Sequence, residues 1–129
     1  MFGTLELTPT PGSVGRARRW SVAFAHDSGL ASVSDTVSLL VSELVSNVVL
    51  HARTPCTLRI DLSDTRIRVD VTDGSDRMPG AGGASDPMAQ SGRGMVLVEA
   101  LSHAHGVDVL AGGGKAVWFE IDLPRERVP

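Results

Sequence analysis

The segment from residue 34 to residue 52 constrains the fold most, because it combines the length of a core helix with a regular line of polar side chains. Its apolar residues recur three and four positions apart, which is the spacing of a helix that buries one face. Glu43, Asn47 and His51 recur every fourth position within this run, and we call them the polar line. At about 100° per residue, these three side chains fall within an arc of roughly 80°. The pattern predicts a helix from about Ser34 to about Ala52 with the polar line beside its buried face.

The polar line does not coincide with the face of this helix that we expect to be solvated. Ser38, Ser42 and Ser46 point in another direction and are expected to face water. The expected core face consists of Val37, Val41, Leu44, Val45, Val48 and Val49, and the polar line is flanked on its other side by Leu39 and Leu50. A lone His or Asn at a helix edge is usually a satisfied polar group. Three such residues in one line favour a binding site that borders a wet cavity.

The remaining elements follow from hydrophobic periodicity. Alternation of apolar and polar residues predicts strands at 2–7, 57–62, 66–73, 105–110 and 115–123. Helical spacing predicts helices at 14–28 and 94–102, the first with Ser13 as its N-cap and Gly29 at its C-terminal end. The paired strands are largely consecutive in the chain. We therefore predict an α+β fold, a two-layer sandwich in which an antiparallel or mixed sheet carries helices on one face.

Asp73 lies at the end of a predicted strand, on the buried face of that strand. Ile67, Val69 and Val71 share this face, and a period of two places Asp73 on it as well. A carboxylate in such a position is costly unless it meets a donor. Two donors remain open: a backbone N–H of the turn that begins at Gly74, or a donor on a bound ligand.

Two glycines, Gly92 and Gly94, precede the predicted helix at 94–102. Glycines at such a position let backbone N–H groups approach a phosphate, and the N-terminus of a helix favours an anion. Glycine before a helix is more often only a turn. Together with the polar line and Asp73, however, the glycines suit a nucleotide: an amide and a carboxylate for a hydrated Mg²⁺ and a nucleophile, an aspartate for an exocyclic amine, and a helix start for phosphates.

Bulk properties narrow the class of protein. The 129 residues suit one domain, 1–129, in which the tail from 124 to 129 is expected to fray. A net charge of −3 argues against direct nucleic-acid binding. Cys56 is the only cysteine, so no internal disulfide can form, which fits a reducing compartment. We see no signal peptide, and the apolar stretches look too short and too interrupted to span a bilayer. A soluble, cytoplasmic protein without a membrane partner is expected.

Four sequence motifs, taken in order, resemble those of one family. LLVSELVSNVVLHA resembles an N box, VDVTDGSDRMP a first glycine box, GRGMVLVEALS a second glycine box, and GGGKAVWFEIDLP a final hairpin. In this order they resemble the GHKL, or Bergerat-fold, ATP-binding domains, specifically the small anti-sigma-factor Ser/Thr kinases. The resemblance extends from about Val14 to Pro124, and its specificity comes from the order of the motifs, because a single box would carry little weight.

The resemblance implies roles for the polar line and for Asp73. Asn47 would be the Mg²⁺ ligand, and Glu43 would be the catalytic general base of the kinase members. His51 would support the site without taking part in the chemistry. Asp73 would receive the amine of adenine. The implied cofactors are therefore ATP and Mg²⁺.

The resemblance also assigns the glycine boxes and the final hairpin. Ser75 stands in place of a glycine in the first box, and Pro79 closes it. The second box would place Gly92, Arg93, Gly94 and Met95 at the phosphates, and residues 80–91 would form the ATP lid. In the final hairpin, this chain has Ala116 where such proteins often carry a Thr or Ser near the adenine. The lid is also short and lacks lysine, so nucleotide binding is expected but its affinity, whether ordinary or weak, is left open.

The function implied by the resemblance is that of an ATP-binding anti-sigma-type regulator. Such a protein would bind a STAS-domain anti-anti-sigma partner and phosphorylate it on a serine, and its other partner would be a sigma factor or none. A homodimer is left open. The rival interpretation is a protein-interaction module of the same fold that sequesters its partner without kinase activity, with nucleotide optional. A structural α+β domain is a third alternative.

Overall fold

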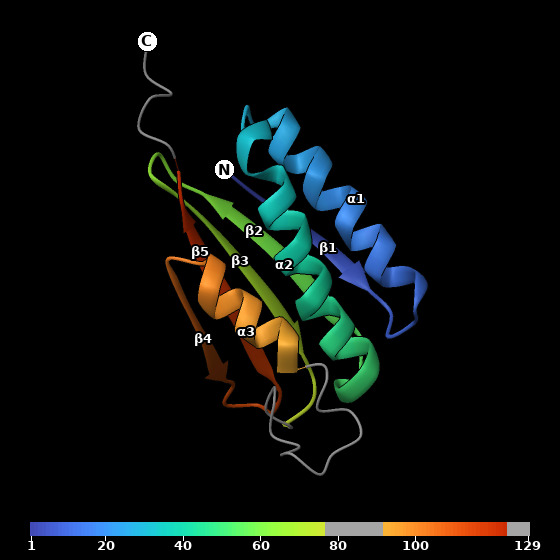
Figure 1. Cartoon of the computed structure of the whole chain (residues 1–129). Helices are drawn as coiled ribbons and strands as arrows, with labels where there is room; N and C mark the ends of the chain where they lie inside the picture. Colours follow the sequence, from blue (N-terminus) through green and yellow to red (C-terminus); the bar gives the residue numbers. More distant parts are fainter. Residues whose placement is uncertain (77–91, 124–129) are drawn as a thin grey trace.

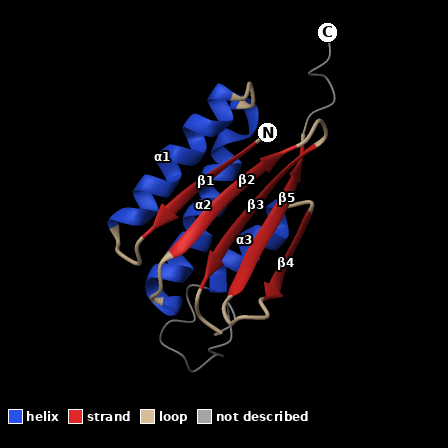
Figure 2. Ribbon diagram, turned by 180° about the vertical axis from the view of Figure 1, so that it is seen from behind, coloured by secondary structure: helices blue, strands red, loops and turns tan. Residues whose placement is uncertain are grey.

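The computed structural model describes residues 1–76 and 92–123. In chain order the elements are β1 (Phe2–Leu7), α1 (Gly12–Asp27), the 3₁₀ turn η1 (Ala31–Val33), α2 (Ser34–Asn47), the π-helical turn η2 (Val48–Ala52), β2 (Cys56–Leu62), β3 (Arg66–Asp73), α3 (Gly92–Leu101), β4 (Ala104–Val109) and β5 (Lys115–Asp122). The strands form one sheet in the order β1-β2-β3-β5-β4, and every neighbouring pair is antiparallel. The three α-helices cover one face of this sheet (Figures 1 and 2). The predicted two-layer α+β sandwich is confirmed, with a purely antiparallel sheet.

The core lies between the sheet and the helices, and α2 occupies its centre, between α1 and α3 (Figure 1). The alternating apolar residues of β2, β3 and β5 point toward this layer and are buried, as are Val37, Val41 and Val45 of α2. Each such side chain stabilises the fold by about 1.5–3 kcal/mol when fully buried. The predicted core face of α2 is confirmed at these positions. The helix that carries the polar line is therefore held on three sides.

The N-terminus of α1 differs from the prediction. The helix begins at Gly12, Pro11 occupies the N-cap position, and no side chain caps the helix. Ser13 is buried inside the first turn, and its hydroxyl donates a hydrogen bond to the carbonyl oxygen of Thr8 at 2.7 Å. The prediction of Ser13 as N-cap is wrong, because this hydroxyl ties the helix to the preceding loop instead of to the helical N–H groups.

The C-terminus of α1 confirms the role expected of Gly29. Ser28 is the C-cap, and Gly29 follows it with a φ of 76°. The N–H of Gly29 donates to the carbonyl oxygen of His26, and the N–H of Leu30 donates to that of Ala25. These two bonds form a Schellman motif, which requires the left-handed conformation that glycine adopts without strain.

Of the three serines of α2 that were predicted to face water, Ser38 and Ser46 are partly exposed but Ser42 is not. Ser42 is buried, and its hydroxyl donates to the carbonyl oxygen of Ser38 at 2.7 Å. The Nε of Arg18 on α1 donates to the same hydroxyl at 3.1 Å. The prediction for Ser42 is wrong because α1 packs against this side of α2, so a small polar residue serves as a helix–helix contact.

The continuous helical segment Ala31–Ala52 is long and apolar enough, by length and composition alone, to cross a membrane. On that measure the expectation that every apolar stretch is too short is wrong. The measure is weak evidence, because the core helix of a globular domain passes the same test. In this fold the apolar side of the segment packs against the sheet and α1, which accounts for its composition.

Smaller differences concern boundaries and the two ranges that are not described. β2 begins at Cys56, one residue earlier than predicted, and α3 begins at Gly92 instead of Gly94. The two glycines of the second box therefore lie within the first turn of the helix. Pro79, the ATP lid predicted at 80–91 and the predicted frayed tail lie outside the described residues.

Candidate nucleotide site

Four segments that are distant in the sequence gather at one end of the sandwich. The C-terminal end of β3, the β4–β5 turn, the end of α2 with η2, and the start of α3 all lie at the lower end of the molecule in Figure 1, and the reverse view agrees (Figure 2). The antiparallel pairing of β3 with β5 and the position of α2 above the sheet produce this arrangement. The predicted site residues within the described ranges therefore share one end of the fold.

The polar line supplies two side chains that no described residue engages. Glu43 and Asn47 are half-buried, and within residues 1–76 and 92–123 neither side chain forms a hydrogen bond or ion pair. They lie one helical turn apart on α2, so both can reach the same ligand. Half-buried polar groups without a protein partner are suited to a ligand, since a ligand can satisfy them without a large rearrangement.

The helix changes geometry immediately after Asn47. Residues Val48–Ala52 form a π-helical turn, and the N–H of Arg53 donates to the carbonyl oxygen of Val48 at 2.7 Å. Arg53 has a φ of 56°, which ends the helix. His51 is half-buried within this turn, so the arc calculated for a regular helix holds for Glu43 and Asn47 but does not extend to His51. Single π turns of this kind are frequent at functional sites.

Asp73 is buried at the end of β3, as predicted, with a relative exposure of 5%. Its Oδ1 accepts a hydrogen bond from the backbone N–H of Ser75 at 2.8 Å, so the turn donor that the sequence left open is present. The same Oδ1 accepts a second hydrogen bond from Nζ of Lys115 at 3.0 Å. The carboxylate therefore has a buried cation as its partner, which the sequence interpretation did not anticipate.

Lys115 faces Asp73 because of the strand register. Asp73 pairs with Lys115, and Thr72 pairs with Ala116. Paired residues share a face of the sheet, so Ala116 lies on the face opposite to Asp73. The final-hairpin residue beside the Asp73 carboxylate is Lys115, one position before the residue that the sequence interpretation selected. Only the register could have identified it.

Hydrogen bonds tie the residues that follow β3 to the β4–β5 turn and to the segment between η2 and β2. The N–H of Gly114 donates to Oδ1 of Asp76 at 3.0 Å, and the N–H of Gly74 donates to the hydroxyl of Thr54 at 2.9 Å. Gly114 has a φ of 86°, and a Cβ added there would lie 2.3 Å from the carbonyl oxygen of Asp73. Only glycine allows this approach. The turn therefore fixes the position of Lys115 at the start of β5.

The glycine boxes are partly described. The backbone carbonyl of Ser75 accepts a hydrogen bond from Nζ of Lys115 at 3.3 Å, so Ser75 belongs to the same cluster as Asp73. Gly92, Arg93 and Gly94 form the first turn of α3, and Met95 packs partly buried against the core. The free N–H groups of a first helical turn can bind phosphate oxygens.

Cys56 borders this site on β2, where it pairs with Asp73. Burial raises the pKa of its thiol from 9.0 to about 11, and the Asp73 carboxylate acts in the same direction. The thiol is therefore inert at neutral pH. It packs as a small apolar group behind the carboxylate, and we assign it no chemical role.

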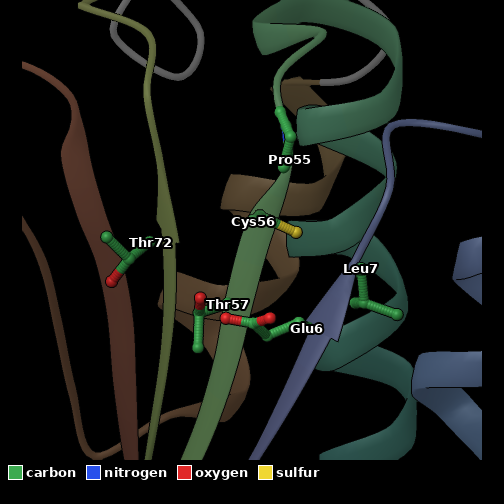
Figure 3. A pocket seen from close by; sticks show the side chains of 6 residues that line it. All are labelled: Glu6, Leu7, Pro55, Cys56, Thr57 and Thr72. Carbon is green, nitrogen blue, oxygen red and sulfur yellow. The ribbon is translucent and has the colours of Figure 1, made fainter.

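Two hollows elsewhere on the described surface do not suit a nucleotide as well. One, with a volume of about 160 Å³, is lined by Glu6, Leu7, Pro55, Cys56, Thr57 and Thr72 (Figure 3). Pockets for ligands of drug size are usually about 300–1,000 Å³. The other, of about 360 Å³, lies at the opposite end of the sheet, where Arg66 and Arg68 are already ion-paired with Glu120.

The site fits a metal that arrives with the nucleotide. In the ranges 1–76 and 92–123, no group of three or more His, Cys, Asp and Glu side chains could hold a metal ion by itself. Mg²⁺ commonly takes one or two protein oxygens and completes its octahedron with phosphate oxygens and waters. The amide of Asn47, which no residue in the described part of the chain engages, fits this requirement.

The structure thus combines a buried aspartate at a strand end with a glycine-containing helix start. The central helix adds an amide and a carboxylate that no described residue engages, and together these groups suit a nucleotide. The profile of the histidine kinase-like ATPase domain matches residues 7–121, and the chain belongs to this family. Comparison with curated proteins gives no match. The family match confirms the resemblance to GHKL-type ATP-binding domains, and ATP binding is the activity that goes with it.

Proposed function

We propose that this ATP-binding protein is an anti-sigma-type regulator that phosphorylates a serine of a STAS-domain anti-anti-sigma partner. The proposal rests on the burial of Glu43 and Asn47 and on their lack of partners among the described residues. Both are half-buried one turn apart on α2, and neither is engaged by a described residue. A carboxylate and an amide in this arrangement suit a proton acceptor and a metal ligand, respectively.

The proposed reaction assigns one task to each residue. Asp73 accepts a hydrogen bond from the exocyclic amine of adenine, and the N-terminus of α3 binds phosphate oxygens. Asn47 holds Mg²⁺, which neutralises phosphate charge when it is bound. The partner's seryl oxygen forms a bond to the γ-phosphorus, the bond to the β–γ bridging oxygen breaks, and ADP leaves. Glu43 accepts the seryl proton.

Two substitutions on α2 test these roles. Asn47→Ala should weaken ATP binding and partner phosphorylation together, because it removes the metal ligand. Glu43→Gln should keep most of the ATP affinity and reduce transfer about 10²–10⁴-fold, which is the usual contribution of a positioned general base. Calorimetric titration with ATP and Mg²⁺ measures binding, and radiolabelled ATP with a STAS-domain protein recovered by pull-down measures transfer.

The control is Glu6→Gln, which removes an exposed carboxylate from β1 on the face of the sheet away from the helices. This variant should match the parent in both assays. Equal transfer by the parent and by Glu43→Gln would show that Glu43 is not the base.

The second candidate is a protein-interaction module that binds its partner without phosphorylating it. The observation that favours it is the ion pair between Lys115 and Asp73, because the carboxylate needed for adenine already has a partner. In that case the parent would capture the STAS-domain protein and never transfer phosphate to it, with or without ATP.

The proposal also covers the cellular location, the other partners and the oligomeric state of the protein. We place the protein in the cytoplasm, with a sigma factor as second partner and no membrane or nucleic-acid partner. Homodimer formation stays a prediction, which sedimentation velocity at several concentrations would test.

A further inference from the structure

Lys115 is unusual among the basic residues of this chain. It is the only lysine, since the other basic residues among the 12 Lys and Arg are all arginines. Its side chain is 5% exposed, and the Asp73 side chain with which it pairs is 2% exposed. A buried charge is retained only where it is paired and hydrogen-bonded. The position of this single lysine therefore requires an explanation.

The surroundings of Lys115 hold its ammonium group against Asp73. The register of β3 and β5 places the two residues directly opposite each other, and Gly114 brings the turn into contact with the β3 backbone. Nζ donates to Oδ1 of Asp73 at 3.0 Å and to the carbonyl oxygen of Ser75 at 3.3 Å. The backbone N–H of Ser75 donates to the same Oδ1. Each group in this cluster thus restrains the next.

The ion pair competes with the interaction that a nucleobase needs. An exocyclic amine binds Asp73 by donating to its carboxylate, and a carboxylate that already accepts from an ammonium is a weaker acceptor for a neutral amine. The ammonium also occupies space beside the carboxylate, in the layer between the sheet and the helices. A base must therefore displace Nζ of Lys115 or share Asp73 with it.

We infer that Lys115 lowers the nucleotide affinity of this site by holding Asp73 in an internal ion pair that competes with the base for the carboxylate. A lysine suits this task better than an arginine, because its compact ammonium on a flexible stem can move aside, whereas a guanidinium binds a carboxylate as a rigid two-pronged donor. The inference rests on the proposed assignment of Asp73 to the base, and it deepens that assignment by naming the residue that opposes binding.

The main test replaces Lys115 with Met, which keeps the length of the apolar stem and removes the charge. Lys115→Met should bind ATP with Mg²⁺ about tenfold more tightly than the parent, since the competitor is absent. The same variant should melt at a lower temperature without nucleotide, because a buried carboxylate loses its cation. A purely structural lysine would lower the melting temperature and leave the affinity unchanged or weaker, and that result would overturn the inference.

A second variant protects the test against poor folding. Lys115→Thr supplies a hydroxyl that can donate to Asp73 without a charge, so it should fold better than Lys115→Met and still bind ATP more tightly than the parent. Affinity equal to that of the parent in a folded Lys115→Thr variant would also overturn the inference.

A direct readout uses the fact that the chain has a single lysine. In protein labelled with ¹³C-lysine, one side-chain signal reports on Lys115, and the Lys115→Met spectrum confirms the assignment. Addition of ATP and Mg²⁺ should shift this signal as the ion pair opens, and an unmoved signal at saturation would contradict the inference. If the folded parent and both variants bind no ATP at millimolar concentration, the assignment of the site itself fails, and this outcome is distinct from equal binding by all three.

Discussion

The three consecutive glycines of the β4–β5 turn allow conformational strain to be separated from a steric clash. A Cβ at Gly112 would meet no atom within 4 Å, and this residue has an ordinary φ. A Cβ at Gly113 would also meet nothing within 4 Å, but its φ is 96°. A Cβ at Gly114 would lie 2.3 Å from the carbonyl oxygen of Asp73, at a φ of 86°. Alanine at each position therefore adds one physical effect at a time.

The expected costs increase along the turn. Gly112→Ala should change the free energy of unfolding by no more than about 0.5 kcal/mol, as surface substitutions usually do. Gly113→Ala should destabilise by about 1–2 kcal/mol, because alanine is strained at positive φ. Gly114→Ala should add a further ~1–3 kcal/mol, since the backbones of β3 and β5 must move apart to relieve the contact.

Thermal and urea unfolding of the three variants measure these costs, and at this chain length 1 kcal/mol corresponds to a shift of about 3–5 °C in Tm. Because the clash falls on Asp73, Gly114→Ala should also weaken ATP binding, whereas Gly113→Ala should leave it close to that of the parent. If Gly114→Ala is no less stable than Gly113→Ala, the close approach between the turn and Asp73 does not exist in solution, and the argument for how Lys115 is positioned fails with it.

Two further predictions concern the same cluster. Asp73→Asn should abolish ATP binding and lower the free energy of unfolding by about 3–5 kcal/mol, because it leaves the Lys115 ammonium buried without its counter-ion; binding as tight as that of the parent, measured by calorimetry, would show that Asp73 is only a turn residue. The Cys56 thiol, with its pKa raised from 9.0 to about 11, should react slowly with a disulfide reagent in the native protein and rapidly in denaturant at about pH 8. Since this pKa is raised on folding, its contribution to stability is complete below pH 9.0 and is lost as the pH rises toward 11, so the free energy of unfolding should decline more steeply over this window in the parent than in Cys56→Ala.

The sequence predicted those features of the fold that depend on local periodicity. The alternation in residues 66–73 predicted β3 and placed Asp73 on its buried face, which the structure confirms. The apolar spacing of α2 identified its core face for the same reason: burial against one layer imposes a period that the chain itself displays. The polar line was visible because it interrupts that period.

Features that depend on packing between elements could not be predicted in this way. Ser42 looked solvated because nothing in the sequence places Arg18 of α1 beside it. Ser13 looked like a cap because serine is a favoured N-cap residue. Its hydroxyl instead donates to the carbonyl oxygen of Thr8, an acceptor that only the loop geometry brings near. The π turn at Val48–Ala52 comes after a stretch of regular helical spacing and leaves no signature in the pattern.

The residue that pairs with Asp73 depends on the register between β3 and β5, and a sequence alone gives little information about strand register. Lys115 is 42 positions away in the chain, and a shift of one residue would have placed Ala116 opposite the carboxylate instead. A lysine at the start of a strand would ordinarily be assigned to the surface. Its burial becomes understandable only when the glycine turn and the β3 carboxylate are seen together.

The same ion pair bears on which of the two candidate functions the protein performs. If Asp73 receives the base, as proposed, Lys115 competes with the nucleotide in every kinase cycle, and the apparent affinity falls in proportion to the fraction of protein in which Asp73 is available. A site weakened in this way is not saturated at all ATP concentrations, and its occupancy therefore varies with the nucleotide level. Glu43 and Asn47 can then serve a kinase that works only when ATP is abundant, whereas an interaction module would use the same opening to alter its partner-binding surface. In the kinase, release of Asp73 from Lys115 would allow phosphoryl transfer. In the interaction module, it would change the surface that binds the partner. The transfer assay on the Glu43→Gln variant distinguishes them, because only the kinase loses an activity when this carboxylate is neutralised.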